Sequence, residues 1–294
     1  MAKSEKLLRS KAERIVLGIA CPILILWSLT LIYPVFWMFI NSFRESAEVA
    51  SLPLGMPTEW HFENWISAFT ETTVRYQNYD GRANLIEMFL NSVWWTAGSV
   101  VISNLVVVMT AYAVAKYNKY FICKALFALN LVVMAIPIVG ALPSQLQLYT
   151  ALGIRNNPAM LLTTAGAIGG SALMIYYSFF KNISWSYAEA VLIDGGGHWT
   201  VFFRVMVPQA TPIIIAMCVI SCIGAWGDYM TPYLFLQDNP TIASGLHLAK
   251  LNHGNEAVPS YLAAVIMSTI PMFILFVCFQ KQIMTNVSMG GLKG

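Results

Sequence analysis

Long, uninterrupted runs of apolar residues dominate the hydrophobic pattern of this chain. Six of these runs are long enough to cross a hydrocarbon layer as helices, which takes about 20 residues. The predicted spans are Ile15–Ile40, Met88–Ala115, Ala125–Leu148, Pro158–Phe180, Thr211–Leu236 and Tyr261–Phe279. The runs are continuous, whereas the strands of a membrane barrel alternate apolar and polar residues. The pattern therefore predicts an all-α integral membrane protein with six transmembrane helices.

The composition also indicates a protein embedded in a lipid bilayer. Of the 294 residues, 57% are hydrophobic and only 11% are charged, whereas a soluble domain carries about 25% charged residues. So much apolar surface exceeds what one water-soluble core can bury, and the bilayer is the expected solvent.

The distribution of positive charge predicts an orientation. Most of the 17 Lys and Arg residues fall in segments that a cytoplasmic N-terminus would place inside. Those before the first span are Lys3, Lys6, Arg9, Lys11 and Arg14. Because basic loops stay on the cytoplasmic side, both termini are expected in the cytoplasm. The first run is too long for a signal-peptide core, so it is expected to remain as an anchor.

The predicted organisation has four parts. Residues 1–14 form a cytoplasmic N-terminus, and residues 15–87 form the first span and a long external loop. Residues 88–280 form the core, and residues 281–294 form a cytoplasmic tail. The external loop, with Trp60 and Trp65, is expected either to lie at the membrane interface or to dock a partner outside the membrane.

The inner loop Lys181–Ala210 has the composition of two short helices joined by a turn. Ser186 and Glu189 have capping-box spacing, which predicts a helix start. Asp194 and the glycines 195–197 then break that helix. A second helix is expected over Trp199–Val205, with Pro208 and Pro212 ending it before the fifth span.

This loop is expected to expose Trp199, Phe202 and Phe203 on the inner face of the membrane. Exposed apolar side chains favour a partner groove. An amphipathic hairpin lying on lipid fits the spacing equally well, so the spacing alone leaves both interpretations open.

Residues 189–212 read EAVLIDGGGHWTVFFRVMVPQATP and resemble the EAA loop of binding-protein-dependent ABC importer permeases. The positions that match the family pattern are Glu189, Ala190, Asp194, Gly195, Phe202, Pro208 and Pro212. Val205 and Val207 are conservative replacements. Two departures stand out: Val191 replaces the third residue of EAA, and Gly196 replaces the Ala that follows Asp-Gly. Just before this stretch, Ser184 stands where many relatives have Pro.

The resemblance implies a coupling loop, at residues 182–210, that docks into a cytoplasmic ABC ATPase dimer. Glu189 would contact a basic residue of that partner, Gly195 would permit the turn, and Phe202 would fill an apolar pocket. It also implies a second homologous permease subunit, an extracytoplasmic solute-binding protein, and a bacterial or archaeal cytoplasmic membrane. ATP and Mg would be bound by the ATPase, with no cofactor in this chain.

Two further segments resemble the carbohydrate branch of these permeases, in particular the second permease of maltose-type systems. The end, FQKQIMTNVSMGGLKG, is similar to tails that finish in Gly-x-x-Lys-Gly, and AWGDYMTPYLFL (Ala225–Leu236) resembles a segment with a Trp and a carboxylate. Trp226, Asp228 and Tyr229 are therefore candidates for the path of a sugar, although an anchoring role at the membrane interface is the alternative. Asn104, Gln145 and Gln147 are expected to form interhelical hydrogen bonds, with contact to the substrate as the alternative.

Catalytic motifs are absent from the sequence. It contains no GxxxxGK[ST] phosphate loop, no GxSxG elbow and no HExxH pair. The expectation is a non-catalytic transport subunit. A permease for a non-sugar solute, a secondary transporter or channel working alone, and a membrane enzyme are the alternatives, in that order.

Overall fold

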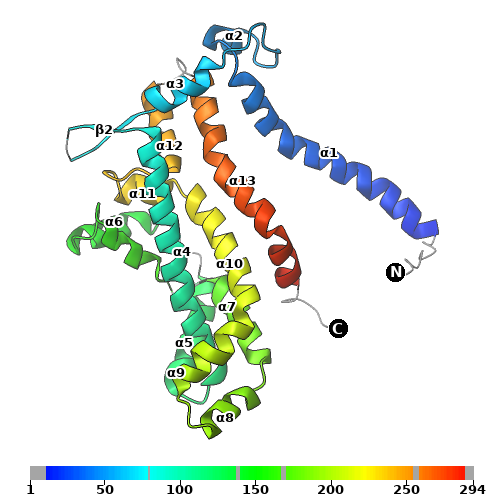
Figure 1. Ribbon diagram of the computed structural model, residues 1–294, viewed down its shortest axis with the longest axis vertical. Coiled ribbons are helices and arrows are strands. Elements are labelled where there is room, and N and C mark those ends of the chain that lie inside the picture. Colours follow the sequence, from blue (N-terminus) through cyan, green and yellow to red (C-terminus); the bar gives the residue numbers. More distant parts are fainter. Residues whose placement is uncertain (1–10, 79, 137–139, 167–169, 254–257, 289–294) are drawn as a thin grey trace. The chain divides into compact units, whose positions relative to one another are not determined.

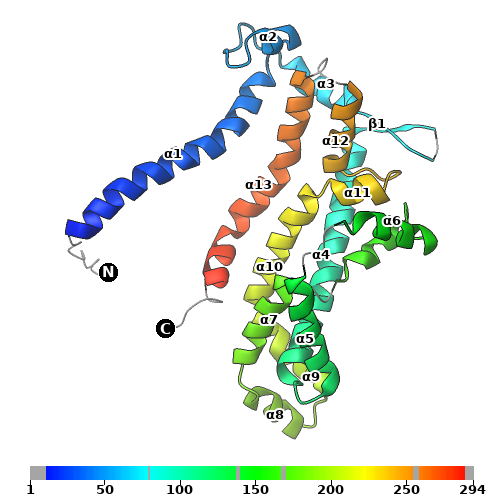
Figure 2. The ribbon, with the colours of Figure 1, turned by 180° about the vertical axis from the view of Figure 1, so that it is seen from behind.

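The computed structural model is almost entirely helical (Figures 1 and 2) and describes residues 11–78, 80–136, 140–166, 170–253 and 258–288. The chain divides into two compact units. Unit 1 comprises Met1–Phe69 and His253–Met267, and unit 2 comprises Thr70–Asn252 and Ser268–Gly294. Each unit is described by itself.

Unit 1 is built on the long helix α1 (Lys11–Asn41), followed by α2 (Ser46–Ser51) and α3 (Glu63–Glu71). The apolar stretch of α1 has none of its residues buried. A helix that is apolar on every side is stable only where lipid or other apolar surface covers it. The position of α1 therefore agrees with the first predicted span.

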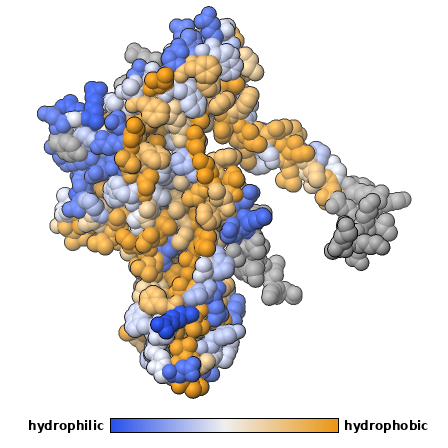
Figure 3. Space-filling view, in the orientation of Figure 1, coloured by the Kyte–Doolittle hydropathy of each residue, from blue (hydrophilic) through white to orange (hydrophobic). Residues whose placement is uncertain are grey.

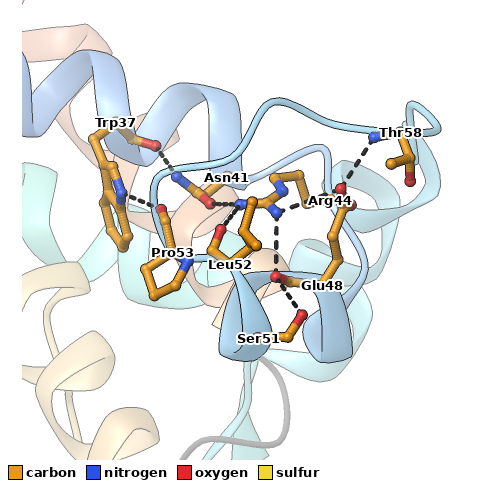
Figure 4. A network of polar contacts seen from close by, with 8 residues as sticks. All are labelled: Trp37, Asn41, Arg44, Glu48, Ser51, Leu52, Pro53 and Thr58. Carbon is orange, nitrogen blue, oxygen red and sulfur yellow. Dashed lines mark hydrogen bonds and ion pairs between the residues drawn. The ribbon is translucent and has the colours of Figure 1, made fainter.

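A polar network fixes the chain directly after α1 (Figure 4). The side chain of Arg44 is fully buried, and its guanidinium donates to Asn41 Oδ1 at 2.8 Å and to the Leu52 carbonyl at 2.9 Å. Arg44 Nη2 also lies 3.3 Å from Glu48 Oε1, which accepts the backbone N–H of Thr58 as well. Partial burial raises the pKa of Glu48. The hydrogen bonds outweigh this effect and lower the pKa below its ordinary value.

Unit 2 begins with a short antiparallel hairpin, β1 (Val74–Arg75) and β2 (Arg82–Ala83), in which Val74 pairs with Ala83. The helices that follow are α4 (Leu85–Lys116), α5 (Phe121–Ala135), α6 (Leu142–Ala151), the 3₁₀ helix η1 (Pro158–Thr164) and α7 (Ser171–Asn182). Next come α8 (Ser186–Ile193), α9 (His198–Val201), the π-helical turn η2 (Phe202–Met206), α10 (Val207–Gly227) and α11 (Met230–Phe235). The last two helices are α12 (Ile242–His253) and α13 (Val258–Ser288), and α13 contributes to both units.

The core of unit 2 forms where α4 packs against α7 and α10. Asn104 of α4 donates to Ser221 Oγ of α10 at 3.3 Å and accepts from the Tyr176 hydroxyl of α7 at 2.8 Å. One amide thus joins three helices, and the prediction that Asn104 forms interhelical hydrogen bonds is confirmed. On the face seen in Figure 3, apolar side chains cover these helices, and hydrophilic ones gather near the β-hairpin and α8.

Four helical stretches in the described residues are long and apolar enough to span a membrane: Val16–Asn41, Leu85–Lys116, His198–Gly227 and Val258–Gln282. The third and fourth predicted spans each consist of two shorter helices instead. The stretch Ala125–Leu148 falls on α5 and α6, and Pro158–Phe180 falls on η1 and α7. The breaks coincide with Gly140, which has a φ of +77°, and with non-helical backbone at Ala165. Continuous helices were the wrong expectation there, because apolarity alone does not report backbone breaks.

Candidate functional site

The loop between α7 and α10 contains the first candidate site. Helix α8 begins at Ser186, as predicted, but the capping box does not form. No side chain caps the helix, and the backbone N–H of Ser186 donates to Ser184 Oγ at 3.3 Å. Glu189 is therefore not used as a cap, and its carboxylate is exposed on the surface of α8.

The turn after α8 has the geometry that its glycines allow. Gly195 has a φ of +82°, a left-handed value that side chains disfavour. A Cβ added at Gly196 would lie 2.6 Å from Val191 Cγ1, so only glycine fits there without movement. Ala190, Asp194 and Gly195 are all exposed at this end of the loop.

The second half of the loop differs from the expectation in two ways. Neither Pro208 nor Pro212 ends a helix, because α9, η2 and α10 run on without interruption. Pro208 lies in the first turn of α10 and Pro212 lies further inside it. Proline is tolerated at position 208 because the adjoining π turn does not require its missing N–H. Phe202 is only 3% exposed and packs on Tyr112 with ring centroids 5.0 Å apart, so the expectation that it is exposed was wrong.

Other apolar side chains of the loop are open to the surroundings. Ile193 is 84% exposed and Trp199 is 65% exposed, and Trp199 stacks on Phe203 at 5.9 Å. These side chains lie at the turn and on α9, on the same loop as Glu189. The site therefore offers an apolar surface with a carboxylate beside it.

The C-terminal end of α4 holds both halves of this loop. Lys116 Nζ donates to the carbonyl of Ile183, just before α8. The Tyr117 hydroxyl lies 2.8 Å from His198 Nδ1 at the start of α9, and its ring packs on Trp185. These contacts attach α8 and α9 to a long apolar helix.

A cavity of about 330 Å³ forms the second candidate site. Helices α4, α6, α10, α11 and η1 contribute its wall. The aromatic residues of the wall are Trp95, Tyr149 and Phe235, and the hydroxyl residues are Ser99, Ser103, Thr163, Thr164, Ser221 and Thr231. Gln145 and Asp228 add an amide and a carboxylate.

The structure separates the three residues predicted for the substrate path. Asp228 lines the cavity at the end of α10, and its Oδ1 accepts the backbone N–H groups of Met230 and Thr231 at 3.0 and 3.1 Å. Trp226 is buried elsewhere, and its indole N–H donates to the Ser268 carbonyl at 2.9 Å. Tyr229 packs on His247 with centroids 4.7 Å apart and does not line the cavity.

Sequence reasoning missed most of the cavity wall. One available signal was the pair Ser99 and Ser103, which are four residues apart on a helix and share a face. Gln145 and Tyr149 are spaced in the same way on α6. The contribution of η1 and α11 had no such signal, because η1 ends at one backbone break and α11 begins after another, and the apolar pattern hides both.

Two loops beside the cavity wall are joined by a reciprocal pair of hydrogen bonds. Asn156 Nδ2 donates to Asp238 Oδ2 at 2.7 Å, and the Asp238 backbone N–H donates to Asn156 Oδ1 at 2.9 Å. Asp238 also accepts from the backbone N–H groups of Gln77 and Asn78. Asn156 donates its own N–H to the carbonyl of Phe235, so the pair holds a wall residue in place.

Within the described ranges, no three His, Cys, Asp or Glu side chains gather in a way that could hold a metal ion. The two sites are thus a helical surface loop and a cavity lined by aromatic, hydroxyl, amide and carboxylate groups, on long apolar helices. Together they define a membrane protein of the permease type.

Comparison with known proteins gives the family. The binding-protein-dependent transport system inner membrane component family matches residues 78–288, and the chain belongs to this family. The chain is 28% identical to the diacetylchitobiose uptake system permease protein NgcG of Streptomyces coelicolor, over 98% of this chain and 93% of that protein. It is 30% identical to the melibiose/raffinose/stachyose import permease protein MelC of Bacillus subtilis, over 72% and 78%.

A solved structure agrees with the fold. A chain of a bacterial ABC transporter involved in the import of the acidic polysaccharide alginate superposes with a TM-score of 0.70 at 21% identity. The match covers 93% of this chain and 98% of that chain.

Proposed function

We propose that this chain forms half of the translocation pathway for a sugar or oligosaccharide in an ATP-driven ABC importer. The cavity is the observation that carries the proposal. Its three aromatic rings suit the apolar faces of a sugar, and its hydroxyl, amide and carboxylate groups suit the sugar's hydroxyls. The relatives named above are permeases for oligosaccharides, which supports the same cargo class.

The loop from residue 182 to 210 is proposed to dock on a cytoplasmic ATPase dimer, which binds ATP and Mg. Its exposed apolar side chains and the carboxylate of Glu189 suit a groove with a basic rim. Ala190, Asp194 and Gly195 would form the docking end of α8. Phe202 and Pro208 would instead join the loop to the permease core, because Phe202 is buried against Tyr112.

The six predicted crossings are retained as a proposal, with the third and fourth made of broken helices. Irregular backbone is tolerated at membrane depth where it lines a cavity. Leu142 follows one break, Thr163 and Thr164 precede the other, and all three line the cavity. Both termini would then lie in the cytoplasm of a bacterial or archaeal cell, as the basic residues predict.

The complete machine would contain this chain, a second homologous permease, the ATPase dimer and an extracytoplasmic solute-binding protein. The proposal is tested by reconstituting these components in proteoliposomes and measuring the accumulation of labelled sugars. We expect ATP-dependent uptake of at least one sugar delivered by the binding protein, and none with an ATPase subunit that cannot hydrolyse ATP. Full ATP-dependent transport of a non-sugar solute, with no uptake across a sugar panel, would overturn the sugar assignment.

A further inference from the structure

Among the described residues, the wall of the cavity carries one formal charge. Of those that line it, Asp228 is the one carboxylate, and no Lys, Arg or His is among them. The other polar side chains of these residues carry hydroxyls, the amide of Gln145 and the indole N–H of Trp95. Whatever occupies this space therefore meets a negative charge with no positive group in the wall to offset it.

The carboxylate of Asp228 is held in place by the backbone. Its Oδ1 accepts two N–H groups at the start of α11, 3.0 Å from Met230 N and 3.1 Å from Thr231 N. In the part of the chain that the structure describes, no basic side chain forms an ion pair with Asp228. The charge is therefore both fixed in position and unpaired.

We infer that this cavity accepts uncharged saccharides and rejects anionic ones, with Asp228 as the residue that discriminates between them. A neutral sugar hydroxyl can donate to the carboxylate, whereas the carboxylate of an acidic sugar would be repelled by it. At separations of several ångströms in a partly buried site, such repulsion weakens binding on the order of tenfold or more.

This inference rests on the proposed function, and binding in the absence of ATP tests it separately. The purified assembly of this chain with its partner permease and ATPase would be placed in lipid nanodiscs. Binding of cellotriose and of trigalacturonate, a neutral and an acidic trisaccharide, would be measured by calorimetry. The variants are Asp228→Asn, which can still accept the two backbone N–H groups, and Asp80→Asn, a matched control at an exposed residue outside the wall.

We expect wild-type and Asp80→Asn assemblies to bind cellotriose at least about tenfold more tightly than trigalacturonate. In Asp228→Asn the difference should shrink to about twofold through a gain for the acidic sugar. Equal affinities in the wild type, an unchanged ratio in Asp228→Asn, or binding of neither sugar would each overturn the inference. The uptake experiment above, and not this one, decides whether the chain serves an importer at all.

Discussion

Val191 and Gly196 are packed against each other across the turn that follows α8. Gly196 donates its N–H to the Val191 carbonyl at 2.8 Å, and a Cβ at position 196 would lie 2.6 Å from Val191 Cγ1. These two positions are among those where the loop departs from the EAA pattern. The side chain and the carbonyl oxygen of Val191 thus occupy the space that a Cβ at position 196 would need, and the glycine leaves that space free.

This pairing predicts a rescue experiment. Gly196→Ala should destabilise the turn by about 1–3 kcal/mol, because the added methyl overlaps Val191. The double variant Val191→Ala/Gly196→Ala should recover part of the loss, since it removes the overlap with Cγ1 but leaves the added methyl 2.9 Å from the Val191 carbonyl oxygen. Sugar-stimulated ATPase activity of the assembly and its melting temperature would report both effects.

Gly197 provides the matched control for that experiment. It lies next in the sequence with a φ of −89°, and an added Cβ would meet nothing within 4 Å. Gly197→Ala should therefore leave activity and melting temperature close to wild type. Equal damage from Gly196→Ala and Gly197→Ala, or no recovery in the double variant, would contradict this packing.

A charge reversal at Glu189 should uncouple the permease from its ATPase. The carboxylate is exposed on α8, so Glu189→Lys should insert in the membrane and fold normally. Uptake should fall by about tenfold or more if the carboxylate faces a basic residue of the ATPase, because a like-charge pair replaces an attractive one. The measurements are uptake in proteoliposomes and co-purification of the ATPase, with Lys181→Glu, a reversal at the end of α7, as the control for charge alone.

The Asn156–Asp238 pair should be important for the loops beside the cavity. Asp238→Ala removes an acceptor used by two backbone N–H groups and by the side-chain amides of Asn78 and Asn156. We expect a loss of about 1–3 kcal/mol, since several donors lose their partner at once. Hydrogen exchange at residues 76–78 and 155–157 should quicken markedly.

The exposed ion pair between Arg75 and Asp80 provides the control for the Asp238→Ala variant. Its atoms lie 3.5 Å apart at the surface, where such pairs contribute little. Asp80→Ala should leave exchange at 155–157 unchanged. If Asp238→Ala proved as mild as Asp80→Ala, the pair would have no stabilising role.

The amide of Asn104 should stabilise the contact between α4, α7 and α10. Tyr176→Phe removes the donor of the 2.8 Å hydrogen bond to Asn104. Asn104→Ala removes this hydrogen bond and the one to Ser221. Interhelical hydrogen bonds in membranes contribute about 0.6–2 kcal/mol each. A double-mutant cycle on the melting temperature should therefore show coupling, and strict additivity of the two variants would argue against this hydrogen bond.

The sequence predicted some parts of this molecule better than others, for physical reasons. Long apolar runs located α1, α4, α10 and α13 because a helix facing lipid must be apolar over its whole length. The same runs hid the breaks in the third and fourth spans. The apolarity of a segment indicates whether lipid or a core surrounds it. A break in the helix depends instead on the backbone conformation of a few residues such as Gly140.

The candidate sites, too, were predicted only in part from the sequence. The run of glycines correctly predicted the turn after α8, because the left-handed φ of +82° at position 195 favours glycine. Burial of Phe202 could not be predicted, because its partner Tyr112 lies on α4, far away in the sequence. Of the three residues proposed for the substrate path, Asp228 alone lines the cavity, since the chain turns at the junction of α10 and α11.

Docking of α8 and its turn on a separate ATPase subunit is the central proposal for this protein. Ile193 is the place to test this, because its side chain is 84% exposed at the end of α8. A photo-crosslinking amino acid at position 193 would be irradiated in the complete assembly in nanodiscs, and the attached molecule identified by mass spectrometry. The account predicts a crosslink to the ATPase subunit; crosslinks to lipid alone would contradict it.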